Sequence, residues 1–168
     1  MSALPEARRG QVADLDRRIR SLPSWRPALE GAPEWYGRLL TSFTLLADDE
    51  PTVYLTGQLE QHDDHLVGYL VSFTASLLVR AKVWGTGDIK ISVTSGARSA
   101  LVLLAASGST SATDEDAEVP WPGNLTFTLT YRSEGDALAL PLDIPDDPNW
   151  PAEQAALLAG LRADLVAP

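Results

Sequence analysis

The chain has 168 residues, no cysteine, and a net charge of −10 that results from 13 basic and 23 acidic residues. A chain of this length is expected to fold as one domain with a sizeable core. Without cysteine it has no disulfide, no thiolate metal site and no cysteine nucleophile. Its acidic balance argues against binding to nucleic acid or to an anionic membrane surface, because both attract basic proteins.

The sequence divides into a mildly basic arm and an acidic body. Residues 1–31 contain six arginines and four acidic residues, a charge of +2, which leaves −12 for residues 32–168. We predict an N-terminal helix with a Pro-rich linker over residues 1–31, and a single β-rich domain over residues 32–168. The start of the chain lacks the apolar core of a signal peptide, and the Ala-, Leu- and Arg-rich composition is typical of a GC-rich bacterial genome. Both features favour a protein of the bacterial cytoplasm.

Residues 5–22 predict an amphipathic helix that ends at Pro23. Four apolar residues recur at spacings of three, four and three and form one stripe on this helix: Val12, Leu15, Ile19 and Leu22. Two interpretations of the stripe remain open. It packs on the chain's own core, or it pairs with a second copy of the chain and makes a homo-oligomer.

A second helix is predicted over residues 33–40, where Pro33 and Glu34 have the residue types that favour a first helical turn. The spacing of Leu39 and Phe43 continues the helical pattern beyond residue 40. The run from Thr41 to Thr44 is nevertheless rich in residues with low helix propensity. Residues 41–47 are therefore open between helix and strand.

The longest apolar stretch, residues 66–83, predicts the central β-hairpin of the fold. Polar residues interrupt it, and from Leu77 onward apolar and charged residues alternate, which is typical of a half-buried strand and not of a membrane helix. The turn is expected at residues 74–76. Alternation and turn residues predict five further strands, at 52–61, 89–94, 100–106, 125–132 and 137–142.

Seven strands followed by an amphipathic helix at residues 150–166 predict an α+β fold that is mainly antiparallel. We expect a partly open barrel or two-sheet roll, capped by the C-terminal helix. Over roughly the last 115 residues, this order of elements resembles the pleckstrin-homology superfold. The resemblance implies no lipid site, because such domains bind phosphoinositides with a basic loop, whereas residues 74–76 are uncharged and Asp63 and Asp64 are acidic.

The segment from residue 107 to residue 123 is the strongest candidate for a binding surface. It is rich in Ser, Thr and Ala and contains four acidic residues: Asp114, Glu115, Asp116 and Glu118. A segment of this composition cannot bury itself and is expected to be mobile. Trp121 stands between two prolines beside it, where an aromatic side chain could anchor a protein partner. The alternative is that Trp121 seals one end of the core.

The chain's two histidines, His62 and His65, bracket Asp63 and Asp64. In a turn, His62, Asp63 and His65 could bring two imidazoles and a carboxylate to one zinc or nickel ion. A solvated polar turn is the alternative.

The sequence predicts no catalytic residues and no cofactor. It has no Gly-x-Ser-x-Gly motif and no phosphate-binding loop, and the run Gly85–Asp88 is expected to be a hairpin turn. We therefore expect a non-catalytic, acidic interaction or regulatory module that binds a protein partner through its acidic loop and sheet surface, and this acidity favours a basic partner. The alternatives are a barrel that binds a small ligand, with or without catalysis, and a structural subunit of an oligomeric assembly.

Overall fold

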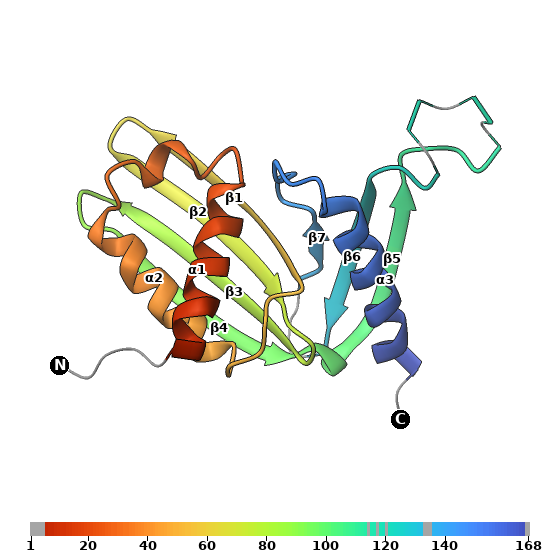
Figure 1. Cartoon of the computed structure of the whole chain (residues 1–168), viewed down its shortest axis with the longest axis horizontal. Coiled ribbons are helices and arrows are strands. Elements are labelled where there is room, and N and C mark those ends of the chain that lie inside the picture. The colour runs from red at the N-terminus through yellow and green to blue at the C-terminus, as the bar shows by residue number, and fades with distance from the viewer. Residues whose placement is uncertain (1–5, 114, 117, 120, 133–135, 167–168) are drawn as a thin grey trace.

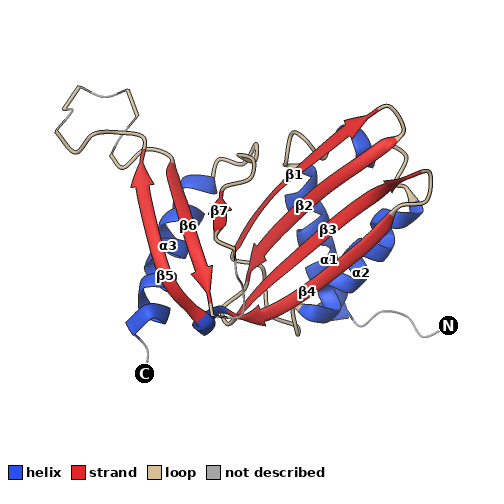
Figure 2. Cartoon of the chain, turned by 180° about the vertical axis from the view of Figure 1, so that it is seen from behind, coloured by secondary structure: helices blue, strands red, loops and turns tan. Residues whose placement is uncertain are grey.

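The computed structural model describes residues 6–113, 115–116, 118–119, 121–132 and 136–166. These residues form an α+β fold in which seven strands make two antiparallel sheets (Figure 1). Helices α1 and α2 cover the first sheet, and α3 covers the second. Seen from behind, the strands of both sheets face the viewer and the helices lie behind them (Figure 2).

The first half of the chain builds the four-stranded sheet, in the order β1-β2-β3-β4. Its elements are α1 (Glu6–Arg20), η1 (Pro27–Leu29), α2 (Glu34–Leu46), β1 (Tyr54–His62), β2 (His65–Phe73), β3 (Leu77–Thr86) and β4 (Lys90–Ala97). The second half builds the three-stranded sheet, in the order β5-β6-β7. Its elements are η2 (Arg98–Ala100), β5 (Leu101–Gly108), β6 (Leu125–Tyr131), β7 (Leu138–Leu140) and α3 (Trp150–Val166).

The predicted hairpin over residues 66–83 is confirmed and lies at the centre of the first sheet. Strands β2 and β3 pair antiparallel from His65 opposite Thr86 to Phe73 opposite Leu78. Successive side chains of a strand point to opposite faces, so this hairpin contributes to two cores. Leu70, Val79 and Val83 belong to the first core, with α1 and α2. The second core, with α3 and the second sheet, contains the other set: Val71, Phe73 and Leu78.

The apolar stripe of α1 packs on the chain's own sheet. Leu15, Ile19 and Leu22 are buried in the first core, and Val12 is half-buried. These three buried side chains are therefore covered by the chain itself and not by a second copy. Trp25 and Leu29, in the segment expected to be a linker, are buried in the same core, so residues 6–31 are an integral part of it.

Residues 41–46, for which helix and strand both remained open, are helical. The hydroxyls of Thr41 and Thr44 donate to the carbonyls of Gly37 and Leu40, four residues earlier. These bonds satisfy the hydroxyls within the helix. Burial of Phe43 in the first core then outweighs the low helix propensity of the threonines.

The expected barrel is not confirmed, and the specific arrangement of the pleckstrin-homology superfold is not confirmed either. In the described part of the chain β4 does not pair with β5, and the two sheets remain separate. The chain leaves the first sheet at η2, before the second sheet begins, so β4 and β5 do not join into one continuous sheet. The two-sheet alternative, with its C-terminal helix, matches the structure.

Arg98 in η2 joins three parts of the molecule at this point. Arg98 is only 8% exposed. The guanidinium donates to the Thr74 carbonyl in the β2–β3 turn at 2.9 Å, and its Nε lies 2.6 Å from the Asp164 carboxylate in α3. Gly160 makes room for it, because a Cβ there would lie 2.6 Å from the guanidinium. Glycine is unfavourable inside a helix, and the close approach of the Arg98 side chain explains why Gly160 stands in α3.

Replacing Arg98 with Met should lower the free energy of unfolding by about 3 kcal/mol, because Asp164 keeps its charge in a largely buried site without its partner. Urea unfolding measures this change. Arg8→Met is the matched control, since its ion pair with Asp49 is exposed and should contribute little to stability. Adding Asp164→Leu to Arg98→Met should recover part of the loss. Equal effects of Arg98→Met and Arg8→Met would contradict this role of Arg98.

Candidate functional site

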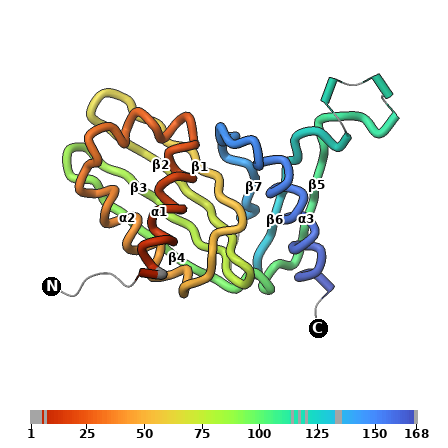
Figure 3. Tube along the Cα trace, in the orientation of Figure 1, coloured from red at the N-terminus to blue at the C-terminus, as the bar shows by residue number. Residues whose placement is uncertain are grey.

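The acidic segment joins β5 to β6 and extends away from both sheets (Figure 3). Glu115, Asp116 and Glu118 are exposed, and Asp114 lies outside the described residues. Trp121 is 66% exposed. It therefore does not seal the core, and its ring is available on the surface beside the acidic residues.

The two ends of this segment are held together by a short neck. The Ser109 N–H donates to the Asn124 carbonyl at 3.0 Å, and the Thr110 N–H donates to the Pro122 carbonyl at 3.2 Å. Gly108 permits this approach, because a Cβ at that position would lie 2.3 Å from the Pro122 oxygen. The neck fixes Trp121 next to the end of β5.

Strand β5 is an exposed, apolar edge of the second sheet. It pairs with β6 on one side only. The sequence predicts a fully apolar strand here, yet every residue except Leu101 and Leu104 is exposed. The largest exposed side chains are Val102, at 46%, and Leu103, at 54%.

The other edge strands carry the usual protection against pairing with foreign strands, which is charge or short length. Strand β1 contains Glu60, β4 begins with Lys90, and β7 has three residues. Strand β5 has eight residues and neither charge nor proline, although its register shifts between Leu101 and Leu103. We call β5, together with residues 115, 116, 118, 119 and 121, the β5 surface.

The two histidines lie at the turn between β1 and β2, opposite each other in register. The His62 side chain is 82% exposed, and the Nδ1 atom of His65 lies 3.2 Å from the Thr86 hydroxyl. Asp63 has a positive φ of 51° at the tip of the turn. Within the described ranges, no three His, Cys, Asp or Glu side chains are placed to hold a metal ion. His62, Asp63 and His65 are therefore not brought together as a ligand set.

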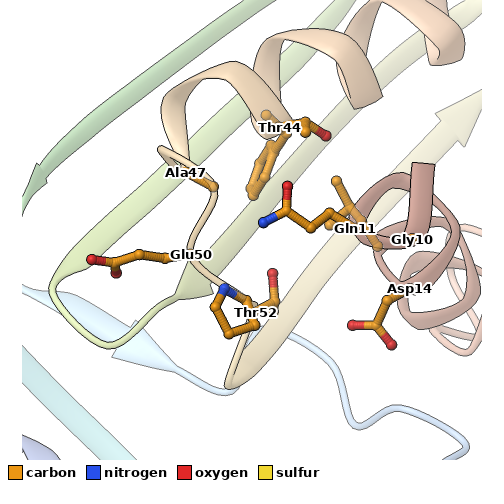
Figure 4. Close-up of a pocket in the computed structure, with 10 residues that line it drawn as sticks. Gly10, Gln11, Asp14, Thr44, Ala47, Glu50 and Thr52 are labelled. Atoms are coloured by element: carbon orange, nitrogen blue, oxygen red, sulfur yellow. The ribbon is translucent and has the colours of Figure 1, made fainter. Parts of the chain in front are cut away.

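A cavity of about 340 Å³ lies between α1, the end of α2 and the start of β1 (Figure 4). Its lining comes from three separate segments, namely residues 10–15, 43–47 and 50–52. Gln11 reaches from α1 toward α2, and its Oε1 atom is enclosed without a hydrogen-bond partner. Sequence reasoning missed this cavity because it depends on how α1 packs beside α2. The one local signal is Gly10, an unexpected residue inside a helix.

Two carboxylates at the cavity have lowered pKa values. The hydrogen bonds from the Ser76 and Thr74 hydroxyls and from the Ser76 N–H lower the pKa of Glu50. Burial alone would raise the pKa of Asp14, but the bonds from Arg17 and Arg18 outweigh burial and lower it. Both groups are therefore ionised at neutral pH, and Glu50 ties the α2–β1 connection to the β2–β3 turn.

The outer face of the first sheet holds a small cationic and aromatic cluster that was also missed. The Lys82 ammonium lies 5.6 Å from the centre of the Tyr69 ring and 5.4 Å from that of Trp84. Lys90 is paired with Trp84 in the strand register, so both lysines of the chain lie on this face. Cation–π contacts account for the cluster without a ligand.

The chain matches no protein-family model, no curated protein and no solved structure. Across the described residues, none of the helices combines the length and the apolar character needed to cross a membrane.

Glu50→Gln should lower stability at neutral pH and make little difference in acid. The folded pKa of Glu50 is lowered, so its contribution is fully present above the unfolded value of about 4.5 and is lost as the pH falls through the folded pKa. Urea unfolding of both proteins between pH 7 and pH 3 measures the difference. A gap that stays constant over this range would contradict the assigned role of the Glu50 carboxylate.

Proposed function

We propose that this chain is a non-catalytic interaction module of the bacterial cytoplasm, and that it binds an extended segment of a basic protein partner along β5. The segment adds a strand to the second sheet, and the acidic residues that follow β5 select its charge. The observation that carries the proposal is the exposed, uncharged edge of β5.

Strand addition explains why such an edge is tolerated. Main-chain hydrogen bonds supply affinity in this binding mode, and the side chains along the edge supply specificity. Leu103 and Val102 lie at one end of β5, and Trp121 and Val119 follow its other end, all with more than 45% of their surface exposed. An extended segment that spans the strand would thus meet apolar contacts at both ends.

The negative charge of the chain supports the proposal that its partner is basic. The body of the molecule is strongly acidic, and Glu115, Asp116 and Glu118 are exposed near the apolar contacts. Interfaces commonly combine an apolar centre with a charged rim, and complementary charge raises the association rate and excludes partners of like charge. The acidic segment therefore supports both attraction and selection.

The alternatives have less support. A small-ligand barrel needs an enclosed interior, and the two sheets do not form a closed barrel. A structural subunit would associate with copies of itself. Its predicted contact, the stripe of Val12, Leu15, Ile19 and Leu22, is largely buried against the first sheet.

A charge placed on the β5 edge should abolish partner binding without unfolding the protein. Leu103→Lys changes an exposed side chain, so its effect on stability should stay within about 0.5 kcal/mol. The tagged protein is used to capture partners from host lysate at low and high salt. Leu45→Lys is the matched control, because Leu45 is 59% exposed on α2, away from β5.

The proposal expects one basic protein that is retained at low salt, released at high salt, and lost with Leu103→Lys but kept with Leu45→Lys. Retention of the same protein by both variants would overturn the β5 assignment. Recovery of the tagged chain with untagged copies of itself, and nothing else, would instead favour the assembly subunit.

Trp121→Ala should weaken binding of the captured partner about tenfold or more, because exposed aromatic anchors commonly contribute over 1.4 kcal/mol to an interface. Its melting temperature should stay close to that of the natural protein, since the ring is exposed. Isothermal titration with the captured partner and a thermal melt measure the two quantities. Unchanged affinity, or a large loss of thermal stability, would show that Trp121 is not an anchor.

A further inference from the structure

We propose that the cavity between α1 and α2 is a binding site for a small amine with an apolar body. This site is separate from the β5 surface, and the inference does not depend on the proposed protein partner. It rests on four features of the cavity: its apolar walls, one unpartnered polar atom, its acidic lining, and the open space beside Gly10.

The walls are suited to an apolar group. Four of the ten lining residues have apolar side chains: Leu15, Phe43, Ala47 and Pro51. A volume of about 340 Å³ lies within the range of sites that hold small molecules, which are mostly apolar with a few polar groups that orient the ligand. An aromatic ring or a short branched chain would fit this environment.

The polar groups of the cavity call for a hydrogen-bond donor. The Oε1 atom of Gln11 is enclosed and has no partner, an arrangement that proteins normally avoid. A turn of the Gln11 side chain, which lines the cavity, would bring this oxygen to a ligand N–H that supplies the missing bond. The Thr44 hydroxyl already donates to the Leu40 carbonyl, so its oxygen also offers acceptor capacity.

The charge of the lining favours a cation. Asp14 and Glu50 are its charged members, both carboxylates, and none of the ten lining residues is basic. Glu50 is engaged with Thr74 and Ser76. Asp14 accepts one bond from Arg17 and one from Arg18, which leaves each of its oxygens able to accept another. A protonated amine supplies the donor and the charge together.

Gly10 is an exposed member of the cavity lining. It lies within α1, where glycine is less favourable than alanine. No atom lies within 4 Å of a Cβ built at this position, so close packing does not require glycine there. A larger side chain at this lining position would extend into that open space beside the cavity.

The probe for this site is 2-phenylethylamine, and its anionic analogue of similar shape is 3-phenylpropanoate. Titration of the full chain, followed by its amide signals in ¹H–¹⁵N NMR spectra, should give saturable shifts at Gln11, Thr44, Ala47 and Thr52 with the amine. The carboxylate should bind at least about tenfold more weakly.

Gly10→Leu should weaken binding of the amine at least about tenfold, because the new side chain adds bulk at a position that lines the cavity. Gly37→Leu is the matched control, since Gly37 is also an exposed glycine in a helix with open space around it, but it is not part of the cavity. Gln11→Leu keeps the bulk of the side chain in the wall and removes the hydrogen-bond acceptor, so it should also weaken binding of the amine. Equal binding by Gly10→Leu and the natural chain, equal binding of both probes, or no saturable shift up to about 10 mM would each overturn the proposal.

Discussion

The double burial of the β2–β3 hairpin is the constraint on which the rest of the structure depends. Leu70 and Val79 face the helices of the first half, while Phe73 and Leu78 face the second sheet and α3. A strand buried on both faces cannot shift by one residue, because every side chain would move into the wrong core. The hairpin therefore sets the register of the first sheet and contributes side chains to both cores, and Arg98 fixes the point at which the chain passes from the first sheet to the second.

This arrangement also determines which parts of the sheets are left uncovered. The first sheet is covered by α1 and α2 on one face and partly by the second core on the other. The second sheet has α3 on one side, and β5 stays open at its edge. An apolar strand thus remains at the surface, next to the most acidic segment of the chain. The two features lie together because the acidic segment continues directly from β5.

The sequence predicts which residues form helices and strands better than it predicts which residues are buried. Alternation, apolar runs and turn residues predict all seven strands, and helical spacing predicts the helix at residues 150–166, because each pattern reflects which side chains share a face. It cannot show that Leu103 lies on an open edge while the equally apolar Leu70 lies in a core, since that depends on which strands become neighbours. The same limit hides the cavity beside Gln11, whose walls come from segments far apart in the chain. The exposure of Glu115, Asp116 and Glu118 is predictable from their polar surroundings, whereas the sequence leaves Trp121 open between surface and core.

Backbone amide exchange along β5, measured with and without the captured partner, tests the central claim most directly. Strand addition gives the outward N–H groups of β5 new hydrogen-bond partners, so their exchange should slow when the partner binds. Protection is expected within residues 101–108, with smaller changes elsewhere in the two sheets. Unchanged exchange along β5, with protection confined to another surface, would contradict this claim.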